Sequence, residues 1–212
     1  MKYKAVIFDL DGVICFTDKY HYLAWKSMAD DEGIYFDEVI NNRLRGVSRM
    51  ESLEIILERA AKEYTEEEKV EMATKKNERY KELLKEMSPA DLPEDVAQAL
   101  KGLKAMGVKI AIGSSSKNAG TILTQIGIID EFDKISDGNN ITNSKPDPEV
   151  FLKAAEMLEL DPKDCLVVED AKAGIAAAKA GRFDCAGIGE AAEDADTTYP
   201  IQKISDLLGI VL

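Results

Sequence analysis

Two aspartates stand where an apolar run ends near the start of the chain. The run Ala5-Val6-Ile7-Phe8 is followed by Asp9, and Asp11 comes two positions later. Because alternate residues of an extended chain point to the same side, we expect both carboxylates to project into one space. Close carboxylates repel each other unless a cation or a proton intervenes. The pair therefore suits a hard-metal site, an acid/base pair, or a nucleophile with an acid/base partner. A purely structural alternative is that one aspartate caps the turn at Gly12.

A second acidic pair follows another apolar run far along the chain. Leu166-Val167-Val168 leads into Glu169 and Asp170. If both runs are strands of one sheet, their carboxyl ends meet at the edge where open α/β sheets bind ligands. Together with Asp9, this pair offers Mg²⁺ two or three oxygen ligands and leaves the remaining octahedral positions to water and phosphate.

Two further polar stretches lie at expected strand ends. One follows the apolar run 108–112, and the other precedes a proline-started helix. Gly113-Ser114-Ser115-Ser116-Lys117-Asn118 comes directly before a predicted helix, where hydroxyl groups and main-chain amides bind phosphate. Ser116 by itself also suits an ordinary helix cap. Ser144-Lys145-Pro146-Asp147 places a lysine where its charge would neutralise the acids. Such residues at four strand ends together indicate a site for a phosphate group rather than packing.

The order of elements predicts a fold that brings these residues together. Runs typical of strands buried on both faces alternate with helical patterns from residue 94 onward. This order predicts a doubly wound, Rossmann-like parallel α/β core. The predicted strands are Ala5–Phe8, Val108–Ile112, Cys165–Val168 and Cys185–Ile188, with a less apolar one at Phe132–Ile135. The predicted helices are 94–106, 117–126, 148–159 and 171–180.

Residues 17–87 break this alternation and predict an inserted helical-bundle cap domain. They contain two capping-box patterns, Ser48 followed by Glu51 and Thr65 followed by Glu68. The predicted α/β core is then formed by residues 1–16 and 88–212, with Ser88-Pro89-Ala90 as the return hinge.

The last helix of the insert, predicted at about 66–87, carries an irregular apolar stripe. The stripe consists of Val70, Ala73, Tyr80, Leu83, Leu84 and Met87. Lys76 and Asn77 fall where it should continue. Lys76 is either a lysine at the edge of a small core or a cationic group aimed at an anion, and the pattern alone does not decide between them.

Composition bounds the class of protein. The 212 residues include 27 Lys and Arg against 40 Asp and Glu, a net charge of −13, which argues against a nucleic-acid partner. No apolar run approaches the ~20 residues of a membrane span. Cys15, Cys165 and Cys185 are odd in number and show no metal-type spacing, which indicates reduced thiols. We expect a cytoplasmic monomer without a membrane partner.

The residues at the strand ends resemble, in type, order and spacing, the four motifs of the haloacid dehalogenase superfamily of phosphotransferases. Asp9-Leu10-Asp11-Gly12-Val13 resembles the first, Ser114 or Ser115 the second, Lys145-Pro146 the third and Glu169-Asp170 the fourth. The resemblance implies that Asp9 attacks phosphorus and becomes an aspartyl phosphate, with Asp11 as general acid/base. It also implies a Mg²⁺ cofactor held by the acids of the site: Asp9, Asp11, Glu169 and Asp170. The dehalogenases themselves lack the second aspartate.

The insert resembles the small cap of the sugar-phosphate mutases in this superfamily, with Arg45 standing where relatives often carry lysine. The resemblance implies a distal phosphate site at Arg49, across the cleft from Lys117 and Asn118, and a hinge network that includes Thr17 and His21. The full implied substrate- and phosphate-binding set is His21, Trp25, Arg45, Gly46, Val47, Ser48, Arg49, Ser52, Lys76, Ser114, Ser115, Ser116, Lys117, Asn118 and Lys145. His21 and Trp25 each also suit an ordinary place in the packing of a cap helix.

By this resemblance, the reaction interconverts β-glucose 1-phosphate and glucose 6-phosphate through β-glucose 1,6-bisphosphate. The partners are then small sugar phosphates. The nearest alternative is a Mg²⁺-dependent sugar-phosphate phosphatase on the same scaffold, in which water resolves the aspartyl phosphate. A non-enzymatic phospho-acceptor or sugar-phosphate sensor is a third possibility, against which the large insert and the presence of both Asp9 and Asp11 argue.

Overall fold

A six-stranded parallel sheet forms the centre of the larger lobe in the computed structural model, which describes residues 1–44 and 47–212. The strands are β1 Ala5–Phe8, β2 Lys109–Gly113, β3 Lys134–Ser136, β4 Cys165–Glu169, β5 Asp184–Gly187 and β6 Tyr199–Pro200. Their order across the sheet is β3-β2-β1-β4-β5-β6, and every pairing is parallel. The predicted doubly wound core is confirmed.

The chain reverses its direction of winding between β1 and β4. From β1 it adds β2 and β3 on one side, and β4, β5 and β6 lie on the other. Ligands of open α/β sheets bind outside the carboxyl ends of the strands at such a switch point. Asp9 follows β1 and Glu169 ends β4, so the sheet places these two acids side by side at that point.

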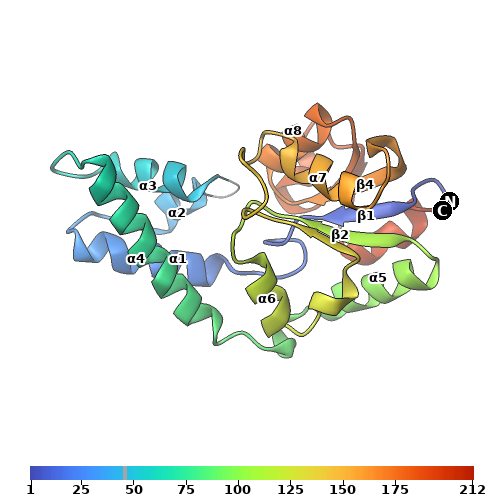
Figure 1. Cartoon of the computed structure of the whole chain (residues 1–212), viewed down its shortest axis with the longest axis horizontal. Helices are drawn as coiled ribbons and strands as arrows, with labels where there is room; N and C mark the ends of the chain where they lie inside the picture. The colour runs from blue at the N-terminus through green and yellow to red at the C-terminus, as the bar shows by residue number, and fades with distance from the viewer. Residues whose placement is uncertain (45–46) are drawn as a thin grey trace.

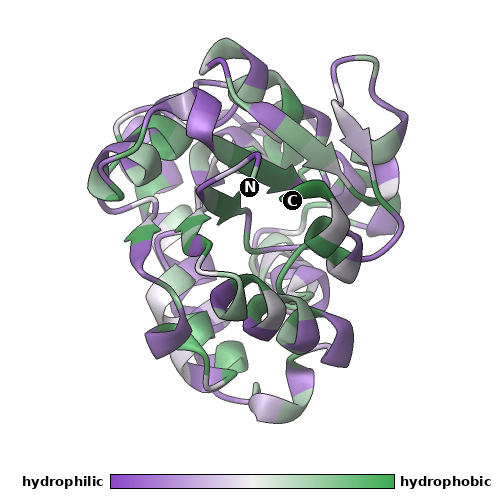
Figure 2. Cartoon of the chain, turned by 90° about the vertical axis from the view of Figure 1, so that its right-hand side faces the viewer, coloured by the Kyte–Doolittle hydropathy of each residue, from purple (hydrophilic) through white to green (hydrophobic). Residues whose placement is uncertain are grey.

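Helices cover both faces of the sheet, as Figure 1 shows with α7 and α8 above it and α5 and α6 below. Along β1, Val6 and Phe8 pack with α5 and α6, whereas Ala5 and Ile7 pack with α7 and α8. All four residues are fully buried, which is why the strand shows an unbroken apolar run rather than alternation. Figure 2 shows the same layering as apolar strands enclosed by more polar helices.

The helices of this lobe have the following bounds. They are α5 Glu94–Ala105, α6 Ala119–Gln125, α7 Glu149–Met157, α8 Lys172–Ala180 and α9 Leu207–Ile210. Short 3-10 helices occur at Pro89–Asp91, Ile129–Glu131, Pro162–Asp164, Gly189–Glu193 and Ile204–Asp206. The predicted elements lie within a few residues of these bounds. Neither β6 nor α9 was predicted, because two and four residues are too few to produce a periodic pattern.

The first four α-helices form a helical lobe, on the left of Figure 1. Its helices are α1 Asp18–Asp31, α2 Glu38–Asn42, α3 Arg49–Leu57 and α4 Glu66–Leu84. The far parts of these helices enclose their own apolar cluster around Trp25, Phe36 and Leu53. The near ends of α1 and α4 join the main core instead, through residues that include Tyr20 and Tyr80. The insert is therefore anchored by two adjacent helices, and the boundaries proposed at 16/17 and 87/88 stay a prediction.

Both predicted capping boxes are confirmed. The Ser48 hydroxyl accepts from the Glu51 amide and Glu51 accepts from the Ser48 amide, and Thr65 and Glu68 do the same at α4. The predicted apolar stripe of α4 was wrong at Val70, which is 56% exposed, because the helix turns that residue toward the cavity described below. The helix also ends at Leu84, before the predicted boundary. No helix in 1–44 and 47–212 is long and apolar enough to cross a bilayer.

Gly174 lies where α8 approaches the end of β4 most closely. A Cβ built at this position would lie 1.9 Å from Glu169 Cδ. In an ordinary helix a Gly→Ala change stabilises by up to about 1 kcal/mol. Here we predict the opposite sign, a loss of about 1–3 kcal/mol from overpacking against a buried carboxylate.

Urea unfolding of Gly174→Ala and wild type measures this loss. Gly120→Ala on α6 is the matched control, because no described atom outside the local main chain lies within 4 Å of a Cβ built there. This control should leave stability unchanged or raise it. A stabilised Gly174→Ala would contradict the close approach.

Candidate active site

A buried lysine joins two acids beneath the switch point of the sheet. Lys145 Nζ donates to Asp9 Oδ1 and Glu169 Oε1, each at 2.5 Å. Burial opposes a charge on Lys145, but the adjacent Asp9 and Glu169 raise its pKa above the ordinary value. The second oxygen of Glu169 accepts from the amides of Asp170 and Ala171 at 3.0 and 3.1 Å. Lys145 is therefore a permanent cation held against the carboxylate of Asp9.

Three carboxylates of this site fit a hard divalent cation. Asp9, Glu169 and Asp170 each offer an oxygen within 4.8 Å of the others. Burial, followed by the charges of Asp9 and Glu169, raises the pKa of Asp170 to about 8. Lys145 balances only one of the three negative charges, so a divalent ion with oxygen preference matches both the charge and the chemistry of the donor set. The fourth predicted ligand, Asp11, lies outside this cluster, and its metal role stays a prediction.

Asp11 instead accepts a hydrogen bond from the hydroxyl of Thr17. Burial raises the pKa of Asp11 to about 7; the hydrogen bond from Thr17 opposes the shift, and the charge of Asp9 adds to it. A carboxyl with a pKa near neutrality exchanges protons readily with a hydroxyl at physiological pH. The environment of Asp11 thus suits the acid/base role that the sequence suggested.

The serine loop after β2 is held from behind by the loop after β3. The amide of Gly138 donates to Ser116 O at 3.2 Å, and Asn139 Nδ2 donates to Lys117 O at 3.0 Å. A Cβ at Gly138 would lie 2.5 Å from Ser115 O, so only glycine permits this approach. Within the loop, Ser116 Oγ accepts from the Asn118 amide at 3.2 Å. The helix-cap alternative for Ser116 was wrong, because α6 begins later than predicted and its N-cap residue is Asn118.

On the cap side, Lys76 and His21 form a buried pair. Lys76 Nζ lies 2.9 Å from His21 Nδ1, and it stands 4.7 Å from the ring centroid of Trp25 and 4.6 Å from that of Tyr80. Burial, followed by the charge of Arg49, lowers the pKa of Lys76 to about 7. Burial and the charge of Lys76 lower the pKa of His21 well below its ordinary range. The charge of Asp11 opposes the shift of Lys76, and a bound anion would stabilise the protonated lysine further.

One hydrogen bond and one cap arginine relate the cap to the core across the cleft. Asn118 Nδ2 donates to Asn77 Oδ1 on α4 at 3.1 Å. Arg49 is the first residue of α3, after the capped turn at Ser48, and lines the same space. Burial lowers its pKa, although a guanidinium remains charged at neutral pH. A second cationic group therefore faces the acids from the cap.

The cleft between the lobes is a cavity of about 550 Å³ that both lobes line. It brings together the predicted site residues with few exceptions. Thr17 contacts Asp11 rather than the cavity, and Arg45 and Gly46 lie outside the described residues. The predicted residues that line it are Asp9, Asp11, His21, Trp25, Val47, Ser48, Arg49, Ser52, Lys76, Ser114, Ser115, Ser116, Lys117, Asn118, Lys145, Glu169 and Asp170.

Several lining residues were not predicted from the sequence. Tyr80 was assigned only to the apolar stripe, yet its ring stacks on His21 with centroids 4.1 Å apart. Thr142 and Ser144 were read only as part of a loop, and Asn41 had no signal at all. Tyr80 could have been assigned to the site from its position four residues after Lys76, which places both side chains on the same face of the helix.

Comparison with known proteins places this fold and site in one family. Residues 3–182 match the family described as haloacid dehalogenase-like hydrolase. The chain belongs to the haloacid dehalogenase-like hydrolase family.

Particular relatives are close to the chain over most of its length. It is 44% identical over 206 residues to the β-phosphoglucomutase of Bacillus subtilis (strain 168), covering 96% of this chain and 91% of that protein. It is 33% identical over 184 residues to a phosphorylated carbohydrates phosphatase of Thermotoga maritima, covering 85% and 82%. A crystal structure of β-phosphoglucomutase from Clostridium difficile superposes with a TM-score of 0.89 at 39% identity, covering 97% and 93%.

The depressed pKa of Lys76 makes stability depend on pH. Between about 7 in the folded protein and the ordinary value of 10.5, the unfolded chain binds a proton that the folded protein does not. Stability therefore rises with pH across this window. Methionine has no such pH dependence. We therefore predict that the unfolding free energy of Lys76→Met, relative to that of wild type at the same pH, is roughly 2 kcal/mol lower at pH 9 than at pH 7.

Urea unfolding at both pH values, without substrate, provides the measurement. Lys75→Met removes an exposed lysine from the same helix and should shift by less than about 0.5 kcal/mol between the two conditions. A pH-independent difference for Lys76→Met would mean that this lysine is fully protonated in the folded protein.

Proposed function

We propose that the chain is a β-phosphoglucomutase that interconverts β-glucose 1-phosphate and glucose 6-phosphate through β-glucose 1,6-bisphosphate. The observation that carries this proposal is a single cavity that the core lobe lines with acids and Lys145 and the cap lobe lines with Arg49 and Lys76. A hexose with a phosphate at each end needs two anion sites on opposite walls. The similarity to the Bacillus subtilis β-phosphoglucomutase over nearly the whole chain supports the same assignment.

At the core end, Asp9 is the nucleophile and becomes the aspartyl phosphate. Asp9 and Asp170, with the charge of Glu169 nearby, would hold Mg²⁺, which would supply electrostatic stabilisation to the phosphoryl group. Lys145 neutralises Asp9 before attack and the phosphoryl oxygens after it, because its Nζ is fixed at 2.5 Å from Asp9 Oδ1. Ser114 and the amides of the serine loop complete the proximal phosphate site.

Asp11 transfers the proton of the sugar hydroxyl. With a pKa near 7, it accepts a proton from the attacking hydroxyl and returns one to the departing sugar oxygen. The hydroxyl of Thr17, at the start of α1, donates to Asp11 and so links its orientation to the first cap helix. Movement of the cap is then coupled to the position of the acid/base.

At the cap end, Arg49 and Lys76 receive the second phosphate, with Lys117 and Asn118 across the cleft. Lys76 gains its proton when the dianion arrives, which favours substrate over water in the closed cavity. A phosphatase that resolves the aspartyl phosphate with water is the second candidate, and the relative in Thermotoga maritima favours it. The cationic groups at the cap end favour the mutase, since hydrolysis of one phosphate requires no second anion site.

The proposed working form is a cytoplasmic monomer. One chain supplies both ends of the cavity, so no partner is needed to complete the site. Cys15, Cys165 and Cys185 are all free and buried, which suits a reducing compartment.

The first prediction of this proposal is isomerisation without net hydrolysis. Incubation with Mg²⁺, β-glucose 1-phosphate and a trace of the bisphosphate should yield glucose 6-phosphate with little free phosphate, while Asp9→Ala yields neither. Coupled detection of glucose 6-phosphate and of inorganic phosphate in the same samples distinguishes the two candidates. Stoichiometric phosphate release without isomer would establish the phosphatase instead.

The second prediction tests the distal phosphate site. Arg49→Ala should raise the KM for β-glucose 1-phosphate by about 10- to 100-fold, because a charge-assisted contact worth about 1.5–3 kcal/mol is lost. Hydrolysis of acetyl phosphate, which has no second phosphate, should change by less than about threefold. Arg79→Ala, exposed on α4, is the control for removing a cap arginine. Equal losses on both substrates would exclude the distal role of Arg49.

A further inference from the structure

We propose that Glu149 is a positioning residue that fixes the segment carrying Lys145, and through it the distance from Lys145 to Asp9. This inference rests on the proposed function of Asp9 as the phosphoryl acceptor. Lys145 lies between β3 and α7, in a stretch without regular secondary structure. Its own main-chain amide makes a long contact of 3.5 Å to Ser115 Oγ. Asp9 and Glu169 hold the ammonium group of Lys145, so the main chain around it is fixed by other contacts.

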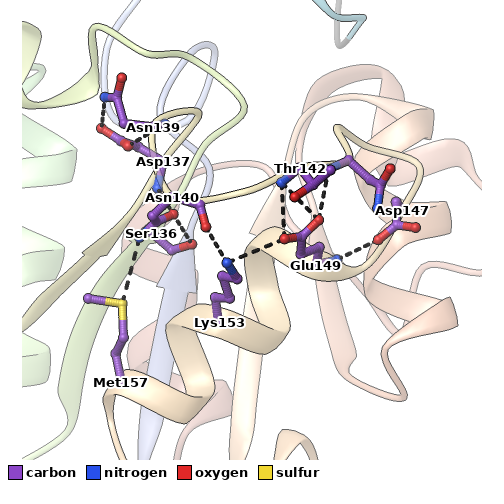
Figure 3. A network of polar contacts seen from close by, with 10 residues as sticks. Ser136, Asp137, Asn139, Asn140, Thr142, Asp147, Glu149, Lys153 and Met157 are labelled. Carbon is purple, nitrogen blue, oxygen red and sulfur yellow. Dashed lines mark hydrogen bonds and ion pairs between the residues drawn. The ribbon is translucent and has the colours of Figure 1, made fainter.

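Glu149, in the first turn of α7, provides that support. Its two carboxylate oxygens each accept from the Thr142 amide at 3.0 Å, and Oε2 also accepts from the Asn143 amide at 2.8 Å. The segment between them is closed by Asp147, whose amide donates to Ser144 O at 3.0 Å and whose Oδ1 accepts from the Glu149 amide at 2.9 Å. Lys145 thus lies in a segment that is held at one end by the Glu149 carboxylate and at the other by the Glu149 amide through Asp147. Figure 3 shows Glu149 with Thr142 and Asp147.

Lys153 fixes Glu149 in turn. One turn along α7, its Nζ forms an ion pair with Glu149 Oε1 at 3.3 Å and donates to Asn140 O. Asn140 closes the turn after β3 by accepting from the Asp137 amide at 3.1 Å. Figure 3 shows Lys153 between these two groups. The loop is therefore attached at both ends to α7, whose inner face is buried against the sheet.

The Glu149 carboxylate is suited to holding this segment and does not take part in the reaction itself. Hydrogen bonds from the Asn143 and Thr142 amides lower the pKa of Glu149, so it is ionised at neutral pH. Thr142 and Ser144 line the cavity, whereas Glu149 is absent from its described lining. Glu149 acts through Lys145, and its loss should affect the reacting phosphoryl group more than substrate binding.

The experiment compares Glu149→Ala and Glu149→Gln with wild type, with Glu156→Gln, exposed on the same helix, as the matched control. We expect Glu149→Ala to lower kcat by about 10- to 100-fold while the KM for β-glucose 1-phosphate changes by less than about threefold. Glu149→Gln retains one acceptor oxygen and should fall between Glu149→Ala and wild type. Glu156→Gln should match wild type.

A double-mutant cycle distinguishes positioning from general stability. In a Lys145→Met background, single-turnover rates should fall by less than about twofold on adding Glu149→Ala, because the group being positioned is gone. A full loss in that background, or wild-type kcat for Glu149→Ala, would overturn the inference. Circular dichroism checks folding, and if Glu149→Ala does not fold, the same cycle with Glu149→Gln decides.

Hydrolysis of acetyl phosphate is measured for every variant, because it also passes through Asp9. A wild type that turns over acetyl phosphate without isomerising β-glucose 1-phosphate would refute the proposed mutase, and the acetyl phosphate rates would still test Glu149. A wild type active on both substrates with an unaffected Glu149→Ala would refute the positioning role alone.

Discussion

The contact between Lys145 and the two acids Asp9 and Glu169 is the constraint on which the site depends. Removing these charges from water is costly, and the cost is recovered only where geometry is good and the remaining oxygens are satisfied. The structure meets both conditions, because Glu169 accepts from main-chain amides with its second oxygen. The sheet supplies the acids from adjacent strands, and the loop before α7 supplies the lysine. Each of these elements is therefore placed by a requirement of charge as well as of packing.

Groups of opposite charge line the cavity, acids on the core lobe and cations on the cap lobe. On the core lobe, burial and then the charge of Asp9 raise the pKa values of Asp11 and Asp170. On the cap lobe, burial is again the largest cause and lowers the pKa values of Lys76 and His21; the charge of Arg49 adds to the shift of Lys76, and the charge of Lys76 adds to that of His21. In the proposed function, a cation at the acids and a phosphate at the cap cations would each offset one of these shifts.

Much of this arrangement could be predicted from the sequence, and particular residues show why. Asp9 and Glu169 were located because each ends a fully apolar run, and parallel strands bring such ends to one edge. The capped starts of α3 and α4 were predicted because a capping box is a local pattern of four residues. Tyr80 and Thr142 were not assigned to the site, since a tyrosine in an apolar stripe and a threonine in a loop have the same local pattern wherever they face. Val70 was predicted to be buried because it has the spacing of the buried face of α4. It is exposed because it borders the cavity.

The sequence by itself determined the chemistry available: which strand ends carry acids, and which loops carry serine and lysine. These follow from local patterns, in which side-chain direction and hydrogen bonding depend on near neighbours. Only the tertiary structure decided that Lys145 lies against Asp9, 136 positions away in the chain, that Lys76 faces His21, and that Glu149 holds the lysine loop. Those contacts join segments that share no local pattern. Their geometry, and with it the pKa of each group, is fixed by how the sheet, the cap and the loops pack together.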